Sequence, residues 1–230
     1  MPLCQMVAHK VTRVHKPDMS REAMRHLSQT DPRFASLIVR VGSPKLSVDR
    51  GRELYEALVR AIAHQQLHGK AAEAILGRFT ALFPDSGFPR PEQVLAADEA
   101  AIRACGFSAA KLAAVRDISA KALDGTVPTR RQAARLPDTE LIERLTSIRG
   151  VGRWTVEMLL IFSLGRPDVL PVDDFGVREG YRLLFDLEAQ PKPRAMADLA
   201  LPWAPWRSFA TWYLYRAVDE ARRQGPSSRA

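Results

Sequence analysis

Cysteines, long apolar runs and strand-like patterns are scarce in this sequence. Its two cysteines, Cys4 and Cys105, are too few for a disulfide framework or for an iron–sulfur cluster held by four thiolates. No apolar run approaches the roughly 20 residues that cross a bilayer, and the first residues lack the apolar core of a secretory signal. We therefore expect a chain that acts in a reducing cytoplasm, or at the nucleoid if its source is bacterial, without a membrane.

Basic residues are plentiful. The chain has 34 Lys and Arg against 26 Asp and Glu, which gives a formal net charge of +8. A protein with this surplus often binds a polyanion, so nucleic acid is a candidate partner. The alternative is a generally basic surface without a partner. The hydrophobic fraction of 46% is sufficient for one large domain or two closely packed lobes.

Helical patterns account for most of the chain. Ser20 is expected to cap a helix that ends near Gln29, and Ser108 a helix that ends at Gly125. About ten helices with short connections predict an all-α architecture. The other helices are expected over residues 34–41, 50–67, 70–83, 98–106, 138–148, 153–164, 175–185 and 206–223. Loops are expected near residues 84–91, 125–137, 167–173 and 190–193.

The segment LTSIRGVGRWT, residues 145–155, is the most informative one. One helix is expected to end at Ile148, a turn with Gly150 and Gly152 follows, and a new helix begins. The unsatisfied N–H groups of this first turn lie at the positive end of a helix dipole and suit a phosphate. A G-x-G pattern alone indicates a plain helical corner, but the flanking apolar residues and the R-W-T that follows are more specific.

This segment resembles the helix–hairpin–helix element of DNA-repair proteins, which grips the DNA backbone without reading sequence. The resemblance implies that the backbone contacts come from Gly150, Val151, Gly152, Arg153 and Thr155. It also implies a site for Na⁺ or K⁺ on the backbone carbonyls of Leu145, Ile148 and Val151. No other cofactor is expected.

The stretch LPVDDF, residues 170–175, extends the resemblance to the helix–hairpin–helix–GPD superfamily, and within it to the AlkA-type 3-methyladenine DNA glycosylase II. That family has a catalytic aspartate at the start of the next helix, which implies Asp174. A fixed carboxylate stabilises the positive charge that develops on a deoxyribose as its base leaves. Asp173 is then interpreted as the helix cap, whereas the two residues alone would indicate two caps.

Trp154 occupies the position at which bifunctional relatives have a lysine. Tryptophan cannot form a Schiff base, and the neighbouring Arg153 is a poor nucleophile. The resemblance therefore predicts a monofunctional hydrolase, acting as a monomer in base excision repair, that leaves an abasic site without cutting the strand. The expected substrates are alkylated purines such as 3-methyladenine and 7-methylguanine in double-stranded DNA.

Such an enzyme must rotate its target base out of the duplex. The stretch AHQQLH, residues 63–68, resembles the family segment that fills the resulting gap. Gln66 matches the intercalating position, and Leu67 beside it is the alternative wedge. An aromatic pocket suits a cationic methylated purine. The residues implied for this base pocket are Trp154, Met158, Phe175, Tyr215 and Gln65.

His64 and His68 are four residues apart, a spacing that can bind zinc on a helix. No third ligand is evident, so contacts with the DNA backbone are the preferred interpretation. An ordinary pair of surface histidines is the alternative that the residues alone would favour.

The resemblance covers residues 27–222 and implies two helical lobes with a cleft between them. We expect one glycosylase domain over residues 20–223, with a central lobe at about 65–170, an arm at 1–19 and a disordered tail at 224–230. Two other functions compete with this prediction. One is a non-catalytic helix–hairpin–helix DNA-binding protein, and the other is a glycosylase for mismatched or oxidised bases.

Overall fold

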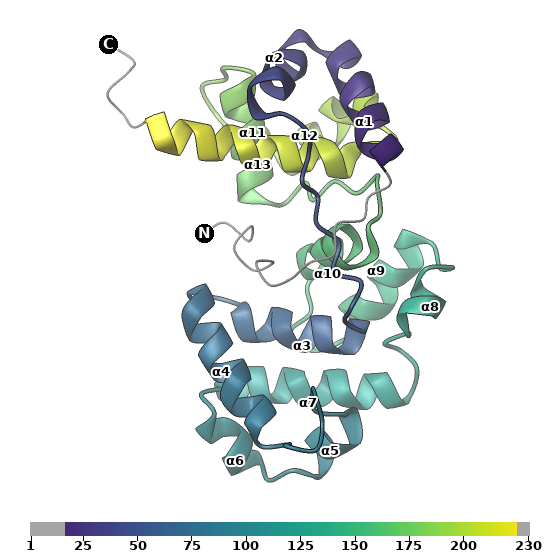
Figure 1. The fold of residues 1–230 in the computed structure, drawn as a ribbon, viewed down its shortest axis with the longest axis vertical. Helices are drawn as coiled ribbons and strands as arrows, with labels where there is room; N and C mark the ends of the chain where they lie inside the picture. The colour runs from purple at the N-terminus through teal and green to yellow at the C-terminus, as the bar shows by residue number, and fades with distance from the viewer. Residues whose placement is uncertain (1–16, 225–230) are drawn as a thin grey trace. The chain divides into compact units, whose positions relative to one another are not determined.

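The computed structural model describes residues 17–224, which form helices and contain no β-strand. The predicted all-α class is therefore confirmed. The helices form two compact units. Residues 49–164 form the central unit, and residues 17–48 together with 165–224 form the terminal unit (Figure 1). The central unit starts before the expected residue 65, because the preceding helix packs against other helices of the same unit. The predicted arm and tail lie almost entirely outside the described residues.

The central unit is built from eight α-helices and one π-helical turn. They are α3 (Leu54–His64), α4 (Gly69–Ala81), α5 (Pro91–Ala96), α6 (Glu99–Ala104), α7 (Ala109–Leu123), α8 (Arg130–Ala133), α9 (Asp138–Thr146), α10 (Arg153–Leu159) and the π-helical turn η2 (Leu160–Leu164). Helix α7 packs against α3, α5 and α6, and α10 packs against α3 and α9.

The terminal unit is built from both ends of the described chain. Its elements are α1 (Pro17–Thr30), α2 (Pro32–Val41), α11 (Phe175–Leu184), α12 (Pro193–Leu199), the short 3₁₀ helix η3 (Leu201–Trp203) and α13 (Arg207–Gln224). Helix α13, yellow in Figure 1, packs against α11, α2 and α1.

Local capping signals explain several helix ends. The Ser108 hydroxyl accepts a hydrogen bond from the Lys111 amide at 3.2 Å, which confirms the predicted cap of α7. The prediction for Ser20 is wrong, because α1 already begins at Pro17, a residue well suited to a first helical turn. The short helices α5, α8 and α12 contain residues that were expected to lie in loops. Each has seven residues or fewer, too short for a recognisable apolar period.

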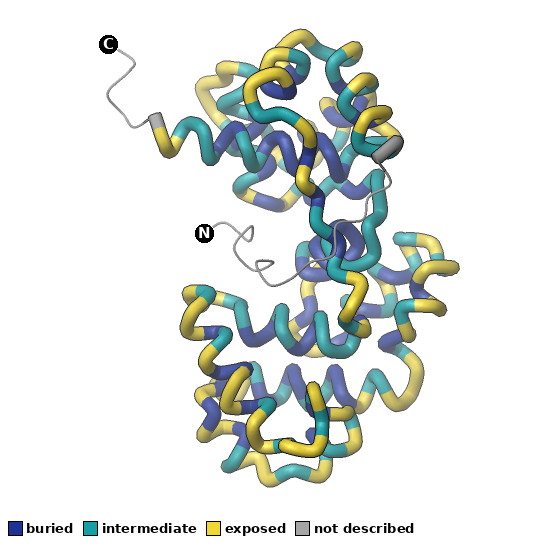
Figure 2. Tube along the Cα trace, viewed as in Figure 1, coloured by how far each residue is buried: buried dark blue, intermediate teal, exposed yellow. Residues whose placement is uncertain are grey.

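Each unit has its own hydrophobic core. In the central unit, α3 and α7 bury Leu58, Ile62, Val115 and Ile118. In the terminal unit, the middle of α13 is buried, as the dark blue tube in Figure 2 shows. Burial of large apolar side chains is the main stabilising contribution to such cores. The aromatic members of the terminal core include Phe34, Trp203, Phe209, Trp212 and Tyr213.

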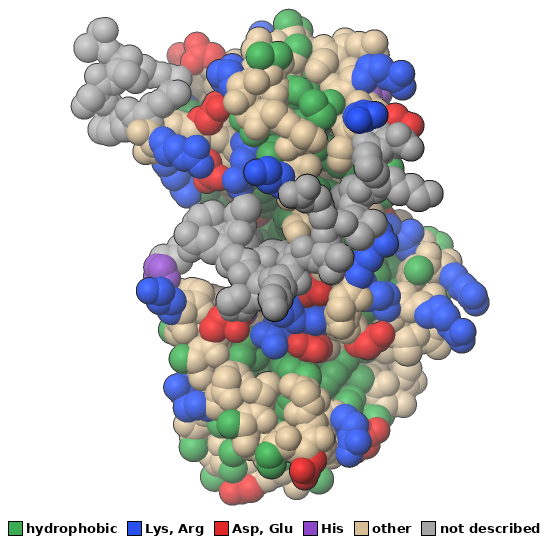
Figure 3. Space-filling model, viewed as in Figure 1, with side chains coloured by type: hydrophobic (Ala, Val, Ile, Leu, Met, Phe, Trp, Pro, Cys, Tyr) green, Lys and Arg blue, Asp and Glu red, His purple; other side chains and the backbone are tan. Residues whose placement is uncertain are grey.

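No helix between residues 17 and 224 is long and apolar enough to cross a bilayer. On the face drawn in Figure 3, Lys and Arg side chains, in blue, are distributed over both units among Asp and Glu side chains. The basic surplus of the sequence is therefore not confined to one unit.

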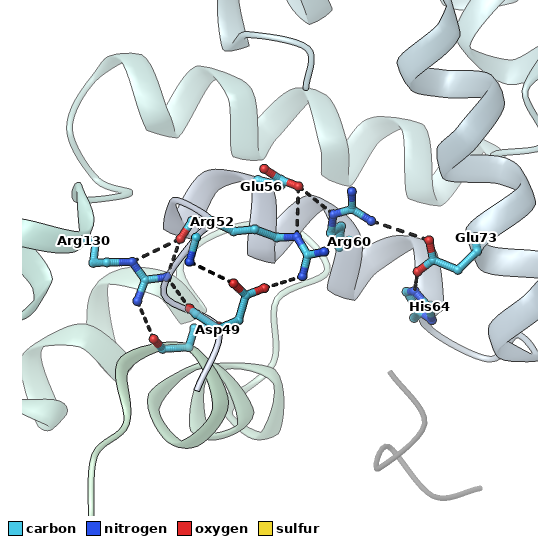
Figure 4. Close-up of polar contacts among 9 residues, drawn as sticks. Asp49, Arg52, Glu56, Arg60, His64, Glu73 and Arg130 are labelled. Atoms are coloured by element: carbon cyan, nitrogen blue, oxygen red, sulfur yellow. Dashed lines mark hydrogen bonds and ion pairs between the residues drawn. The ribbon is translucent and has the colours of Figure 1, made fainter. Parts of the chain in front are cut away.

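Arg130, at the start of α8, organises the two ends of the central unit. Its guanidinium donates to the carbonyl oxygens of Asp49 and Arg52 near the first end, and to that of Ser163 near the second (Figure 4). The Asp49 amide also donates to the Phe162 carbonyl at 2.9 Å. Burial lowers the pKa of Arg130, although the nearby Glu53 and Asp49 oppose that shift. The Arg130 side chain thus hydrogen-bonds to both the segment by which the chain enters this unit and the segment by which it leaves.

Candidate functional site

Asp174 is the N-cap of α11 in the terminal unit. Its Oδ1 accepts a hydrogen bond from the Val177 amide at 2.8 Å, and the residue is only 9% exposed. The capping role expected for Asp173 is therefore wrong, because Asp174 makes the cap and Asp173 is exposed. The cap bond fixes the Asp174 carboxylate at the positive end of the α11 dipole, where a negative charge is stabilised.

Tyr215 lies beside this carboxylate. A Cβ atom placed on Gly176 would be 2.9 Å from Cε1 of Tyr215 and 3.1 Å from Oδ1 of Asp174. The aromatic ring and the carboxylate therefore flank the same backbone atom in the first turn of α11. Phe175, next to Asp174, is 64% exposed, which is unusual for a side chain of its size. The structure thus brings together three of the predicted site residues, Asp174, Phe175 and Tyr215.

A close helix crossing sets this arrangement. A Cβ atom on Gly180 would be 2.2 Å from the carbonyl oxygen of Leu214 on α13. Only glycine allows the two backbones to approach so closely. The residues of α11 before and after this contact, including Gly176, are thereby held against α13. This role of Gly176 and Gly180 was not predicted from the sequence, although two glycines four residues apart on one helix are the pattern that indicates it.

The predicted hairpin is present in the central unit. Helix α9 ends at Thr146, Gly150 has a φ of 76°, and Gly152 is the N-cap of α10. The Val151 amide donates to the Ile148 carbonyl at 3.1 Å, so this amide is used inside the turn. The Val151 amide, on a residue predicted to contact the DNA backbone, is therefore already paired within the hairpin.

The first turn of α10 has amides that no carbonyl of the same helix can reach. A Cβ atom on Gly152 would meet nothing within 4 Å, so the backbone is open to an approaching molecule there. The Arg153 side chain is 60% exposed and its Nε lies 2.9 Å from Oε1 of Glu157. Thr155 is buried, which leaves its backbone rather than its hydroxyl for a phosphate.

The turn between α3 and α4, the 65–68 turn, carries the predicted wedge. Gln66 and Leu67 are exposed, Leu67 to 37%. Gln66 has a φ of 57°, a region that residues other than glycine seldom adopt. The Gln65 side-chain amide donates to the Gly150 carbonyl at 3.0 Å, so Gln65 joins this turn to the hairpin. The structure therefore places the wedge and the hairpin side by side within one unit.

The two predicted backbone-binding histidines differ in environment. His68 is exposed at the N-cap of α4. The His64 side chain is only 6% exposed, and its Nε2 lies 2.9 Å from Oε1 of Glu73 (Figure 4). Arg60 lies 3.6 Å from the same carboxylate and 2.8 Å from Glu56. The prediction that His64 contacts DNA is corrected, because its ring is paired with Glu73 inside the central unit.

The residues expected in the base pocket divide between the units. Trp154, Met158 and Gln65 belong to the central unit, and Phe175 and Tyr215 to the terminal unit. Met158 is buried and Trp154 is partly buried on α10.

Comparisons with known proteins identify the family of the chain. The chain matches the family model of the HhH-GPD superfamily base excision DNA repair protein over residues 59–205. DNA-3-methyladenine glycosylase 1 of Schizosaccharomyces pombe is 46% identical over 193 residues, which cover 83% of this chain and 84% of that relative.

Two solved structures are also similar. The 3-methyladenine DNA glycosylase of Schizosaccharomyces pombe in complex with abasic DNA has a TM-score of 0.75 and 46% identity, over 85% of this chain and 95% of that chain. A DNA-3-methyladenine glycosidase from Bacillus halodurans has a TM-score of 0.78 and 29% identity, over 93% of this chain and 96% of that chain.

Proposed function

The chain belongs to the HhH-GPD superfamily of base excision DNA repair proteins, and we propose that it is a monofunctional glycosylase for alkylated purines in duplex DNA. The observation that carries this proposal is the buried, capped carboxylate of Asp174 beside Tyr215. The relative with 46% identity is named a DNA-3-methyladenine glycosylase, which supports 3-methyladenine as a substrate, and 7-methylguanine is the second substrate that we propose.

Asp174 is the catalytic residue of this proposal. As the N-glycosidic bond breaks, its electron pair leaves with the base and positive charge develops on the sugar. A carboxylate whose position is fixed by the Val177 amide stabilises that charge without reorganising. Water then adds to the sugar carbon and loses a proton, which yields an abasic site and a free base. A purine alkylated on a ring nitrogen is already a good leaving group, so no general acid is required.

Aromatic side chains beside the carboxylate support a site for the base. Phe175 and Tyr215 lie next to Asp174 in the terminal unit and offer π faces. A cationic purine over such a face gains about 0.5–2 kcal/mol. The other residues predicted for the pocket, Trp154, Met158 and Gln65, belong to the central unit, where the Gln65 side-chain amide is bonded to the Gly150 carbonyl.

The hairpin and the 65–68 turn hold the DNA. The first-turn amides of α10, with Gly152 open to approach, bind phosphate together with the exposed Arg153 and His68. Gln66 or Leu67 fills the space that the flipped base leaves.

The backbone of the hairpin also fits a monovalent cation. The Ile148 carbonyl accepts the Val151 amide at 3.1 Å, which leaves a second lone pair on its oxygen, whereas the Leu145 carbonyl accepts the amides of both Ile148 and Ser147. With the Val151 carbonyl they would hold Na⁺ or K⁺, which supplies a positive charge close to a DNA phosphate.

Hydrolysis without strand cleavage follows from the residues of the hairpin. Trp154 has no amine, and the Arg153 guanidinium is paired with Glu157. Borohydride should therefore trap no covalent complex between enzyme and damaged DNA. A trapped complex would contradict the monofunctional assignment.

The decisive experiment is base release from a duplex that carries 3-methyladenine or 7-methylguanine. Asp174→Asn should bind this duplex but release base about 100- to 1000-fold more slowly. Asparagine is as good an N-cap as aspartate, so the variant should remain folded. The adjacent, exposed Asp173 provides the matched control, and Asp173→Asn should retain wild-type release.

Normal release by Asp174→Asn would refute the catalytic assignment. Binding of DNA by the wild type without release of any base from a panel of alkylated, oxidised and mismatched duplexes would indicate the non-catalytic alternative.

A further inference from the structure

The 65–68 turn, which follows the C-terminal end of α3, has a backbone conformation that is unfavourable for residues other than glycine. The Gln65 amide donates to the Ala61 and Ile62 carbonyls at 3.2 and 3.3 Å, and the Leu67 amide donates to the His64 carbonyl at 3.2 Å. Gln65 has φ −53° and ψ 127° and the next residue has a φ of 57°. These values describe a type II turn, in which the third position favours glycine.

Gln66 occupies that third position. A non-glycine residue with positive φ persists only when its surroundings hold it in place. The side chain of Gln66 is exposed, so packing of that side chain does not supply the restraint. The restraint must come from the neighbouring backbone groups.

Lys111 supplies it. From the first turns of α7, its Nζ donates to the Ala63 carbonyl at 2.8 Å and to the Gln65 carbonyl at 2.7 Å. Both carbonyls lie where α3 ends and where the negative end of its dipole is exposed, which favours a compact cation. Burial lowers the pKa of Lys111, as expected for an ammonium group removed from water.

The Gln65 carbonyl belongs to the peptide group that joins Gln65 to Gln66, so a contact that fixes this carbonyl also fixes the orientation of that peptide. Lys111 therefore grips the turn immediately before Gln66, while the Gln65 side chain ties the same turn to the Gly150 carbonyl. With both contacts present, the turn projects Gln66 and Leu67 from a fixed base. The functional consequence is a wedge that does not have to be ordered when DNA binds.

We propose that Lys111 is a positioning residue for base flipping, which acts by holding the 65–68 turn in the conformation that presents Gln66 and Leu67. The proposal rests on the proposed glycosylase function. It adds a residue of α7 that contacts neither the base nor the sugar, and it predicts that losing Lys111 impairs extrusion of a paired base more than cleavage of its glycosidic bond.

The test compares two substrates under single-turnover conditions. One is a duplex with 7-methylguanine opposite cytosine, and the other has the same lesion opposite an abasic site, where flipping is easier. Lys111→Met removes the ammonium and retains most of the side-chain volume. We expect about a tenfold lower rate on the paired lesion and less than about a twofold change on the unpaired one.

Lys121→Met on the same helix is the matched control, since the Lys121 ammonium is paired only locally with Asp124 at 3.3 Å. It should leave both rates unchanged. Lys111→Arg keeps the cation and should recover part of the rate on the paired lesion. If Lys111→Met melts well below the wild type, the paired-to-unpaired ratio of Lys111→Arg replaces it as the readout.

Equal losses on the two substrates would reduce Lys111 to a structural residue and overturn the proposal, as would wild-type rates on both. Absence of release by the wild type from both duplexes would instead refute excision of 7-methylguanine, the proposed activity on which this proposal rests, so the two failures are distinguishable.

Discussion

The two units use glycine for opposite purposes. In the central unit, Gly150 and Gly152 shape a turn, and a Cβ atom on Gly152 would meet nothing within 4 Å. In the terminal unit, Gly176 and Gly180 lie in a regular helix, and Cβ atoms there would meet Tyr215 and the Leu214 carbonyl. Gly152 keeps backbone open to a partner, whereas the terminal pair lets the protein pack against itself. Gly150 is packed as well, since a Cβ atom there would be 3.1 Å from Cβ of Ala114.

This difference decides what substitution should do in each unit. A methyl group added at an open glycine should weaken binding of DNA and leave the stability of the fold nearly unchanged. A methyl group added at a packed glycine should destabilise the fold even without DNA. Substitution at Gly152 should therefore lower DNA affinity more than stability, and substitution of the packed terminal pair should lower stability more than DNA affinity.

The largest expected effect is at Gly180. Gly180→Ala places a methyl carbon 2.2 Å from a backbone oxygen of α13, and backbone cannot move aside as a side-chain tip can. We expect the free energy of unfolding to fall by about 3 kcal/mol or more, measured by denaturant titration. Gly77→Ala on α4 is the control, because that position is open and alanine favours a helix interior. A stable Gly180→Ala variant would show that the α11–α13 crossing is less close than described.

Gly176→Ala should act on chemistry more than on stability. Its methyl group would be 2.9 Å from Cε1 of Tyr215, a ring edge that can rotate away. That movement displaces the ring from its place beside Asp174, so we expect base release to slow by about 10- to 100-fold. Release rate and melting temperature are measured together. Wild-type release would mean that the position of Tyr215 does not matter for the reaction.

Gly152→Ala tests the open position. Its φ of −88° is ordinary, so we expect a stability loss of only about 0.5 kcal/mol from the weaker N-cap. DNA affinity, measured by fluorescence anisotropy over a salt series, should fall by about tenfold because the methyl group meets a phosphate. Gly150→Ala gives the contrast, since a φ of 76° and a Cβ position 3.1 Å from Cβ of Ala114 make alanine cost about 1 kcal/mol or more in stability. Unchanged affinity in Gly152→Ala would refute the hairpin contact.

The smallest effect is expected for an ion pair of the terminal unit. Burial tends to raise the pKa of Asp168, but hydrogen bonds from Arg207 at 2.7 and 2.8 Å outweigh it and lower that pKa. Asp168→Asn should therefore cost up to about 1 kcal/mol at pH 7, a modest value because both side chains are partly exposed. A carboxyl whose pKa is lowered in the folded state stabilises the fold above its unfolded-state pKa of about 4. This stabilisation is lost as the pH falls through the folded-state pKa. The stability difference from wild type should vanish in acid, and a difference that persists at pH 2 would exclude the ion pair as its source.

The sequence was sufficient for the helical class, the hairpin and the carboxylate position. Glycines next to a helix start and aspartates after a proline-containing loop indicate local backbone structure that does not depend on tertiary contacts. The sequence alone could not decide whether Asp173 or Asp174 is the cap. The N-cap is the residue just before the helix, so moving the start of the helix by one residue exchanges the two aspartates. The structure shows that one residue can be both the cap and the proposed catalytic group.

Other features depend on tertiary partners. His64 was expected at the surface, but Glu73 lies on the next helix and pairs with it. Lys111 is 46 residues from the Gln65 carbonyl that it binds, and no local pattern marks that contact. The short helices α5, α8 and α12 were missed because fewer than two turns carry no reliable apolar period.

The Arg130 contacts have a topological consequence. Within the described residues, the central unit is a single stretch, residues 49–164, whose two ends are close enough to share one guanidinium. A peptide linker of a few residues should therefore join these two ends. New termini could then be opened at an exposed loop, such as residues 84–87, to produce a circularly permuted central unit that retains the hairpin.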